Sequence, residues 1–136
     1  MNNAILVNLQ RCTGCWTCSL ACKMGNNLPD DTWRQIVRTL GSGEGIDKPA
    51  GTWPDLHLEW QPVWLKGCTM CQRRTQEGEL PFCVMDCPNR ALTFGDIEDQ
   101  ESEIFQQKEE LRKQGFRIFD LPCYEATRPG IIYARK

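Results

Sequence analysis

Eight cysteines in two sets constrain the fold of this chain more than any other feature. The first four follow the pattern C-x2-C-x2-C-x3-C, and the second four end in a cysteine directly followed by Pro88. In each set the early cysteines can share one tight loop, whereas the last lies about a helical turn further on and points away from it. The two sets are Cys12, Cys15, Cys18 and Cys22, and Cys68, Cys71, Cys83 and Cys87.

This spacing predicts two [4Fe–4S] clusters as cofactors. In bacterial two-cluster ferredoxins the last cysteine of each run binds the other cluster. Because that pairing joins the beginning of the chain to its middle, most of the fold should depend on the metal. The predicted ligands are Cys12, Cys15, Cys18 and Cys87 for the first cluster, and Cys68, Cys71, Cys83 and Cys22 for the second.

Two other uses of these cysteines compete with iron–sulfur binding. Zinc also takes four thiolates, and C-x2-C pairs are its usual signature. Zinc sites seldom need a third cysteine at the same short spacing, and this favours iron. A disulfide framework is disfavoured by the odd count of nine cysteines, by the length of 136 residues and by the lack of a signal peptide at the start.

Composition excludes several other classes of protein. No apolar stretch approaches the ~20 residues of a membrane helix, and a net charge of -2 gives no basic footprint for nucleic acid. We therefore expect no nucleic-acid partner and no direct membrane insertion. No catalytic residue is predicted, because there is neither a Ser-His-Asp set nor a glycine-rich phosphate loop. His57 is expected to be a surface or packing residue, and Cys123 a free thiol.

The two cysteine halves form a weak internal repeat, which is the expected twofold layout of a bacterial ferredoxin-like dicluster domain. With the helical and β-capable segments around them, the expected fold is α+β, with a loop insertion and a C-terminal helix plus extended arm. We assign residues 1–95 to the two-cluster domain, with an irregular insertion at 26–66, and residues 96–136 to the helix and arm. Expected strands or extended segments are an edge strand at Asn3–Leu9, then Trp33–Leu40, Leu56–Leu65, Arg90–Phe94, Phe116–Phe119 and Ile131–Tyr133. Expected helices are Ser19–Met24 and Asp96–Gln114, and Gly41–Asp55 is expected to be an irregular loop.

Nearly the whole chain resembles one family, the iron–sulfur electron-transfer subunits of the dimethyl-sulfoxide-reductase family of molybdopterin oxidoreductases. The opening CTGCWTCSLACK is similar to the start of these subunits. The stretch from Cys68 to Asp96 resembles their last motif, with its polar loop ending in Leu-Pro, its C-x3-C-P and its R-A-L and F-G-D. LRKQG at 111–115, the Leu-Pro at 121–122 and the terminal RPGIIY resemble the family's helix, turn and closing strand.

The resemblance implies an electron-transfer subunit that is not an enzyme on its own. It would relay electrons between an external donor protein and a large catalytic subunit with molybdenum or tungsten on a bis-pterin. Typical members carry four clusters, but no cysteine lies between Cys22 and Cys68 here, so the chain resembles a short two-cluster form. Short forms of this kind accompany some anaerobic reductases, including dehydroxylases.

A free two-cluster ferredoxin that shuttles electrons between enzymes is the alternative. Five tryptophans, the long loops and the C-terminal arm favour a docked subunit, since tryptophan is enriched at interfaces. The expected compartment is the cytoplasm, or export in the folded state with a partner that carries a twin-arginine signal.

Overall fold

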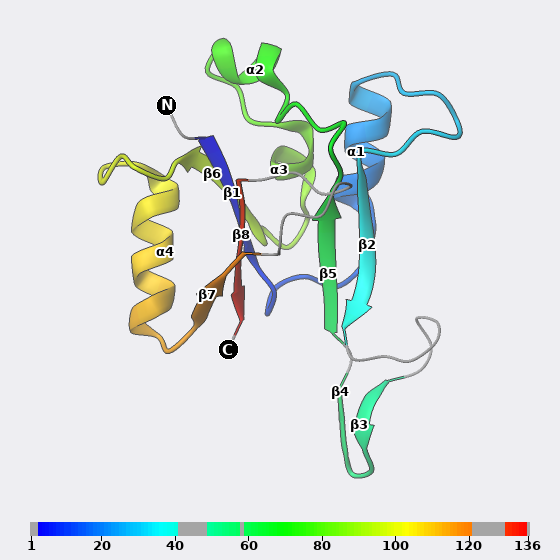
Figure 1. Cartoon of the computed structure of the whole chain (residues 1–136), viewed down its shortest axis with the longest axis vertical. Coiled ribbons are helices and arrows are strands. Elements are labelled where there is room, and N and C mark those ends of the chain that lie inside the picture. Colours follow the sequence, from blue (N-terminus) through cyan, green and yellow to red (C-terminus); the bar gives the residue numbers. More distant parts are fainter. Residues whose placement is uncertain (1–2, 41–48, 58, 121–129, 136) are drawn as a thin grey trace.

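A four-stranded sheet lies at the centre of the fold (Figure 1). The computed structural model describes residues 3–40, 49–57, 59–120 and 130–135. In sheet order the strands are β6 (Leu92–Asp96), β1 (Asn3–Asn8), β8 (Ile131–Arg135) and β7 (Arg117–Phe119). Strand β1 pairs antiparallel with β6 and parallel with β8, and β8 pairs antiparallel with β7.

Strand β1 is buried on both of its faces. Ala4 and Leu6 pack in a core that includes residues of helix α4 (Glu103–Lys113). Ile5 and Val7 pack in a second core that includes Cys68 and Cys83. The predicted strand is confirmed, but its predicted place at an edge of the sheet is wrong. Its successive apolar residues suit a strand that is covered on both sides.

Three shorter helices lie on the side of the sheet opposite α4 (Figure 1). The three helices are α1 (Thr17–Gly25), α2 (Gln72–Gln76) and α3 (Phe82–Asp86). Helix α1 confirms the helix predicted at 19–24 and packs against α3. Helices α2 and α3 were not predicted, because five residues are too few to show a helical period.

The long charged helix begins later than predicted, at Glu103 instead of Asp96. The carboxylates of Asp96 and Asp99 each accept a backbone N–H two residues further on, at 3.0 Å. Such local bonds hold residues 96–101 in turns and compete with the helix. Ser102 then caps the helix by accepting a backbone N–H at 3.3 Å. The predicted stop at Gly115 is confirmed, with φ of 92°.

The segment between the two cysteine sets forms two small antiparallel sheets. The strand predicted at 33–40 is confirmed, and it pairs with residues 59–64 of the extended segment predicted at 56–65. Pro62 lies in a sheet of only two strands, as its missing N–H requires. The predicted irregular loop at 41–55 is wrong for residues 50–55, which belong to a hairpin that ends at residue 57, whereas 41–48 lie outside the described residues. The pairs are β2 (Gln35–Leu40) with β5 (Glu59–Trp64), and β3 (Ala50–Thr52) with β4 (Asp55–His57).

The C-terminal residues do not form the predicted extended arm where the structure describes them. Residues 131–135 are an interior strand, and Tyr133 is 1% exposed. The Tyr133 hydroxyl donates a hydrogen bond to the Pro62 carbonyl at 2.7 Å and so joins the two larger sheets. The arm's middle, residues 121–129, lies outside the described residues. The domain boundary at residue 95 stays a prediction, although segments from both sides of it share one sheet.

Candidate metal centres

The first group of thiols surrounds a pocket between the start of α1 and residues of strands β2, β5 and β6. Four cysteines line it: two from the loop that leads into α1, one from the first turn of α1, and one from the residue after α3. Gly14 has φ of 71° and Trp16 has φ of 64°, so the loop turns sharply twice. Backbone in such alternating conformations points N–H groups into a concavity that suits anions and iron–sulfur clusters. The four thiols are those of Cys12, Cys15, Cys18 and Cys87.

The second group of thiols surrounds a pocket at the C-terminal end of β5. It contains two cysteines from the loop after β5, one from α3 and one from α1. Met70 and Cys71 have φ of 54° and 51°, so this loop repeats the left-handed turns of the first without using glycine. The four thiols are those of Cys22, Cys68, Cys71 and Cys83.

The packing of α1 against α3 produces the crossed grouping. Helix α1 carries Cys18, which lines the first pocket, and Cys22, which lines the second. At α3, Cys83 lines the second pocket, and Cys87, directly after the helix, lines the first. The two helices approach closely at Gly25, where a Cβ atom would overlap the Phe82 ring. The structure therefore brings together the same sets of four that the sequence predicts, and their role as ligands stays a prediction.

Burial differs between the two groups. Cys22, Cys68 and Cys83 are all at most 9% exposed, whereas Cys15 is exposed. Burial raises the pKa of Cys18 to about 12, and it raises the pKa of Cys22 as well. These thiols would be protonated at neutral pH without a metal, because a buried thiolate is costly.

Cys15 behaves in the opposite way. Its slight burial acts to raise its pKa, but hydrogen bonds from Thr17 and Thr13 outweigh that effect and lower the pKa. Both threonines lie within two residues of Cys15, and Thr13 also accepts a hydrogen bond from Asn89 at 2.8 Å. This bond joins the first cysteine loop to the turn after Cys87. The exposed corner of the first pocket is therefore the part best suited to hold a thiolate.

Several N–H groups point at the cysteine sulfurs. The backbone N–H of Met70 donates to Cys68 Sγ at 3.3 Å, and that of Ala91 donates to Cys87 Sγ at 3.4 Å. The Asn26 side chain donates to Cys22 Sγ at 3.6 Å, one helical turn beyond that cysteine. Hydrogen bonds to sulfur stabilise extra negative charge and set the potential of an iron–sulfur centre. The cysteine pattern alone did not predict this role of Asn26, although its i+4 spacing from Cys22 was a usable signal.

Trp64 contributes a buried N–H to the second pocket. It is 2% exposed, and its Nε1 is buried without a normal hydrogen bond among the described residues. Burial raises the pKa of Cys83, and the Trp64 N–H acts against that rise, which places the indole N–H beside this sulfur. Its strand position gave no sign of this contact, because the contact depends on how β5 meets α3.

The first cysteine loop also packs against a tryptophan. A Cβ atom at Gly14 would overlap the indole of Trp60, so only glycine fits both this contact and the left-handed φ. Trp16, which lies inside this loop, is 40% exposed and contacts the Trp33 ring edge-on at a centroid distance of 6.2 Å. One tryptophan thus covers the loop from within, and a pair of tryptophans is left at the surface.

The donor sets fit the predicted cofactor. The eight cysteines are free thiols, four around each pocket. Within the described ranges, no three His, Cys, Asp or Glu side chains converge closely enough to hold a single ion. A mononuclear zinc site needs four sulfurs at about 2.3 Å from one ion. A cubane spaces its cysteines more widely, because each thiolate binds a different iron.

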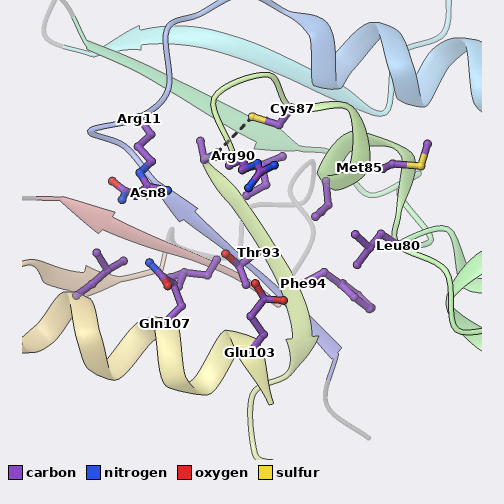
Figure 2. Close-up of a pocket in the computed structure, with 15 residues that line it drawn as sticks. Asn8, Arg11, Leu80, Met85, Cys87, Arg90, Thr93, Phe94, Glu103 and Gln107 are labelled. Carbon is purple, nitrogen blue, oxygen red and sulfur yellow. Dashed lines mark hydrogen bonds between the residues drawn. The ribbon is translucent and has the colours of Figure 1, made fainter. Parts of the chain in front are cut away.

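A further pocket of about 470 Å³ adjoins the first thiol group (Figure 2). Figure 2 shows Arg11 and Arg90 near Cys87 at one end, and Glu103 and Gln107 of α4 at the other. The dashed line there marks the hydrogen bond to Cys87 Sγ. This pocket carries charges of both signs, so it has no clear preference for an anion or a cation.

Two other residues singled out in the sequence are not part of either thiol group. His57 is exposed on β4, paired with Ala50 across the hairpin, which agrees with a surface residue. Cys123 lies outside the described residues. Among the helices of the described segments, none has the length and apolar character needed to cross a membrane.

Comparison with known proteins bears on the cofactor. A family model described as a 4Fe-4S dicluster domain matches residues 47–97, which hold the second cysteine set. A provisionally named iron–sulfur subunit of dimethyl sulfoxide reductase from Halobacterium salinarum is 22% identical, over 76% of this chain and 69% of that protein. A subunit of the tetrathionate reductase of Salmonella typhimurium is 24% identical, over 96% of this chain and 71% of that protein. The arsenate respiratory reductase iron–sulfur subunit of a Shewanella strain is 32% identical, over 68% of this chain and 32% of that protein.

The chain is a relative of these iron–sulfur subunits. The resemblance seen in the cysteine motifs is thereby confirmed, as is [4Fe–4S] as the type of cofactor. The chain spans about a third of the arsenate reductase subunit, so that protein contains much that has no counterpart here. The alignment of this chain with the Halobacterium subunit runs over 182 residues, more than the 136 of this chain. The Halobacterium subunit therefore carries additional internal sequence.

Proposed function

We propose that this chain carries two [4Fe–4S] clusters and relays single electrons between an external donor and a molybdopterin catalytic subunit with molybdenum or tungsten. The complex would be an anaerobic reductase or dehydroxylase, and this chain would have no catalytic residue of its own. The names of its relatives support this proposal, because they are subunits of reductases.

The observation that carries the proposal is the presence of two pockets with four thiols each. When bound, a cluster at each pocket accepts and releases one electron at a time. The eight cysteines would hold the clusters in the crossed arrangement, and the N–H groups at the sulfurs would favour the reduced state. Trp60 and Trp64 would keep water from the inner sides of the two pockets.

The first pocket offers an exit for electrons, because Cys15 is exposed beside it. Trp16, which caps α1, and Leu20 and Met24 within it follow at intervals of four residues, and their side chains are 40%, 49% and 72% exposed. Side chains at i and i+4 lie on the same face of a helix. We infer that this apolar strip contacts the catalytic subunit, which would shield it and bring its own cofactor near the first cluster.

The short form of the chain shapes the rest of the proposal. Two clusters make a shorter path than the four of typical family members, so a protein donor would replace a long route to a membrane anchor. The additional internal sequence of the relatives agrees with a missing inner module in this chain. The complex would work in the cytoplasm, or be exported folded with a partner that carries a twin-arginine signal.

Anaerobic isolation of the chain with its natural partners tests this function. We expect about eight iron atoms per chain, from four per cluster, and a large co-purifying subunit with molybdenum or tungsten. Iron without a partner or second metal would indicate a free ferredoxin instead. Zinc without iron would refute the cluster assignment altogether.

A further inference from the structure

A further pocket lies beside the second thiol group, and we call it the hollow. It has a volume of about 840 Å³ and opens between the C-terminal end of α1 and helix α2. Figure 1 shows these two helices at the same end of the molecule, at the top of the view. Cys71 lines both this hollow and the second thiol pocket. The hollow therefore connects the surface with the predicted second cluster.

The lining of this hollow is basic and contains no acidic residue. Three arginines contribute to it, and most of the remaining polar groups are the amides of asparagine and glutamine. The whole chain has a net charge of -2, so this local excess of positive charge runs against the overall balance. The lining includes Arg34, Arg73, Arg74, Asn26, Asn27 and Gln72.

Two of the three arginines are available to a ligand. Arg74 is held in place by an ion pair with Glu79 at 3.1 Å and a hydrogen bond to the Leu80 carbonyl at 2.9 Å. Within the described residues, Arg34 and Arg73 have neither an ion pair nor a hydrogen bond from their side chains. Guanidinium groups without partners favour carboxylates or phosphates.

Arg34 links the hollow to the second cluster position. Its side chain lines the hollow and also the pocket that Cys22, Cys68 and Cys83 surround. An acidic group held by Arg34 would thus lie next to the second thiol group. The pocket of Figure 2, beside the first thiol group, differs because its lining includes the acidic Glu103 as well as Arg11 and Arg90.

We propose that the hollow lined by Arg34 and Arg73 docks an acidic one-electron carrier protein, which donates its electron at the second cluster. The proposal rests on the function proposed above, because it names the donor by its chemistry and gives it a place. In each encounter the reduced carrier loses one electron and this chain gains it, and no bond is made or broken. The electron would then leave at the other thiol group, where Cys12, Cys15, Cys18 and Cys87 would hold the first cluster.

The positive charge of the hollow beside a predicted cluster favours an acidic protein as its occupant. Basic residues around a redox centre steer an acidic partner, and such steering raises association rates by a factor of 10–10³. It acts on the rate of encounter more than on the lifetime of the complex. A surface of this kind should therefore show itself in rates that fall with salt.

The test measures reduction of the chain, purified anaerobically with its iron, by a reduced plant-type [2Fe–2S] ferredoxin as the acidic probe. Stopped-flow absorbance gives the second-order rate constant. We expect it to fall about tenfold when the salt concentration rises from about 0.05 to about 0.5 M. The double variant Arg34→Gln, Arg73→Gln should lower it about fivefold or more at low salt.

A matched double variant at the other pocket serves as the control. Arg11→Gln with Arg90→Gln removes the same charge beside the first thiol group, and we expect less than a twofold change, within the weak effect of distant charges. Equal losses in both double variants, or a larger loss in the control, would overturn the proposal. So would a rate that salt does not change, or a failure of the probe to reduce clusters that dithionite does reduce.

Iron content and dithionite-reduced spectra separate this inference from the proposed function. A chain without cluster iron refutes the proposed function before any docking is measured. A chain with reducible clusters and no effect of Arg34 and Arg73 refutes the docking site alone. Unchanged iron content in both double variants shows that neither substitution has damaged the fold.

Discussion

The substitution Trp64→Phe tests how the protein would tune the proposed second cluster. It removes one buried N–H beside Cys83 and keeps an aromatic ring in the same place. A hydrogen bond to a charged group contributes about 1.5–3 kcal/mol. Reduction adds one negative charge to a centre that is already charged, so only the difference between the two states, about 1 kcal/mol, affects the potential. For a one-electron couple this corresponds to a decrease of about 40 mV.

Potentiometric titration followed by electron paramagnetic resonance measures this shift for each cluster separately. Trp60→Phe is the matched control, because Trp60 lies on the same strand and packs against the first cysteine loop. We expect the second potential to fall in Trp64→Phe and to stay unchanged in Trp60→Phe. A rise in Trp64→Phe, or equal shifts of the second potential in both variants, would refute the role of this N–H. The smaller ring also leaves space in the core, so we expect a stability loss of about 1–3 kcal/mol, which unfolding experiments report independently of the potential.

Three further predictions concern the thiol groups. Gly14→Ala should speed cluster loss more than Gly78→Ala. Both glycines have positive φ, but only at Gly14 would the new Cβ atom overlap a neighbouring ring. Bleaching of the cluster absorbance measures the two rates. The variants Cys22→Ser and Cys87→Ser should alter the spectra of the second and first clusters respectively, and an uncrossed result would refute the assignment. Burial raises the pKa of Cys18 to about 12, so this thiol would have to lose a proton when metal binds. Cluster loading should therefore weaken as the pH falls and strengthen as the pH rises towards that value. Iron content after equilibration at each pH measures this.

Local sequence patterns predicted most of the strands and the sets of four thiols. Cysteine spacing is a short-range signal, and the crossed grouping follows once two such loops face each other across helices α1 and α3. The strands at 3–8 and 59–64 were equally visible, because their apolar and β-branched residues leave few other choices.

What the sequence did not reveal depends on contacts between distant segments. Strand β1 was expected at an edge, since nothing local shows that residues 131–135 pair with it. The late start of α4 follows from the carboxylates of Asp96 and Asp99, which prefer turns at a place where the charge pattern suggested a helix. The partners of Trp64 and Arg34 were hidden for a similar reason, because each reaches a pocket built from several segments.

The parallel pairing of β1 with β8 has a consequence for the order of events during synthesis. The eight cysteines emerge from the ribosome with residues 12–87, long before residues 131–135 do. Until then β1 has an open edge, and the core behind the second thiol pocket lacks Ile131 and Tyr133. Pairing between such distant segments is slow, because a long loop must close first. The nascent chain can therefore meet its iron before its sheet is complete, and the last strand would close the protein over metal already in place.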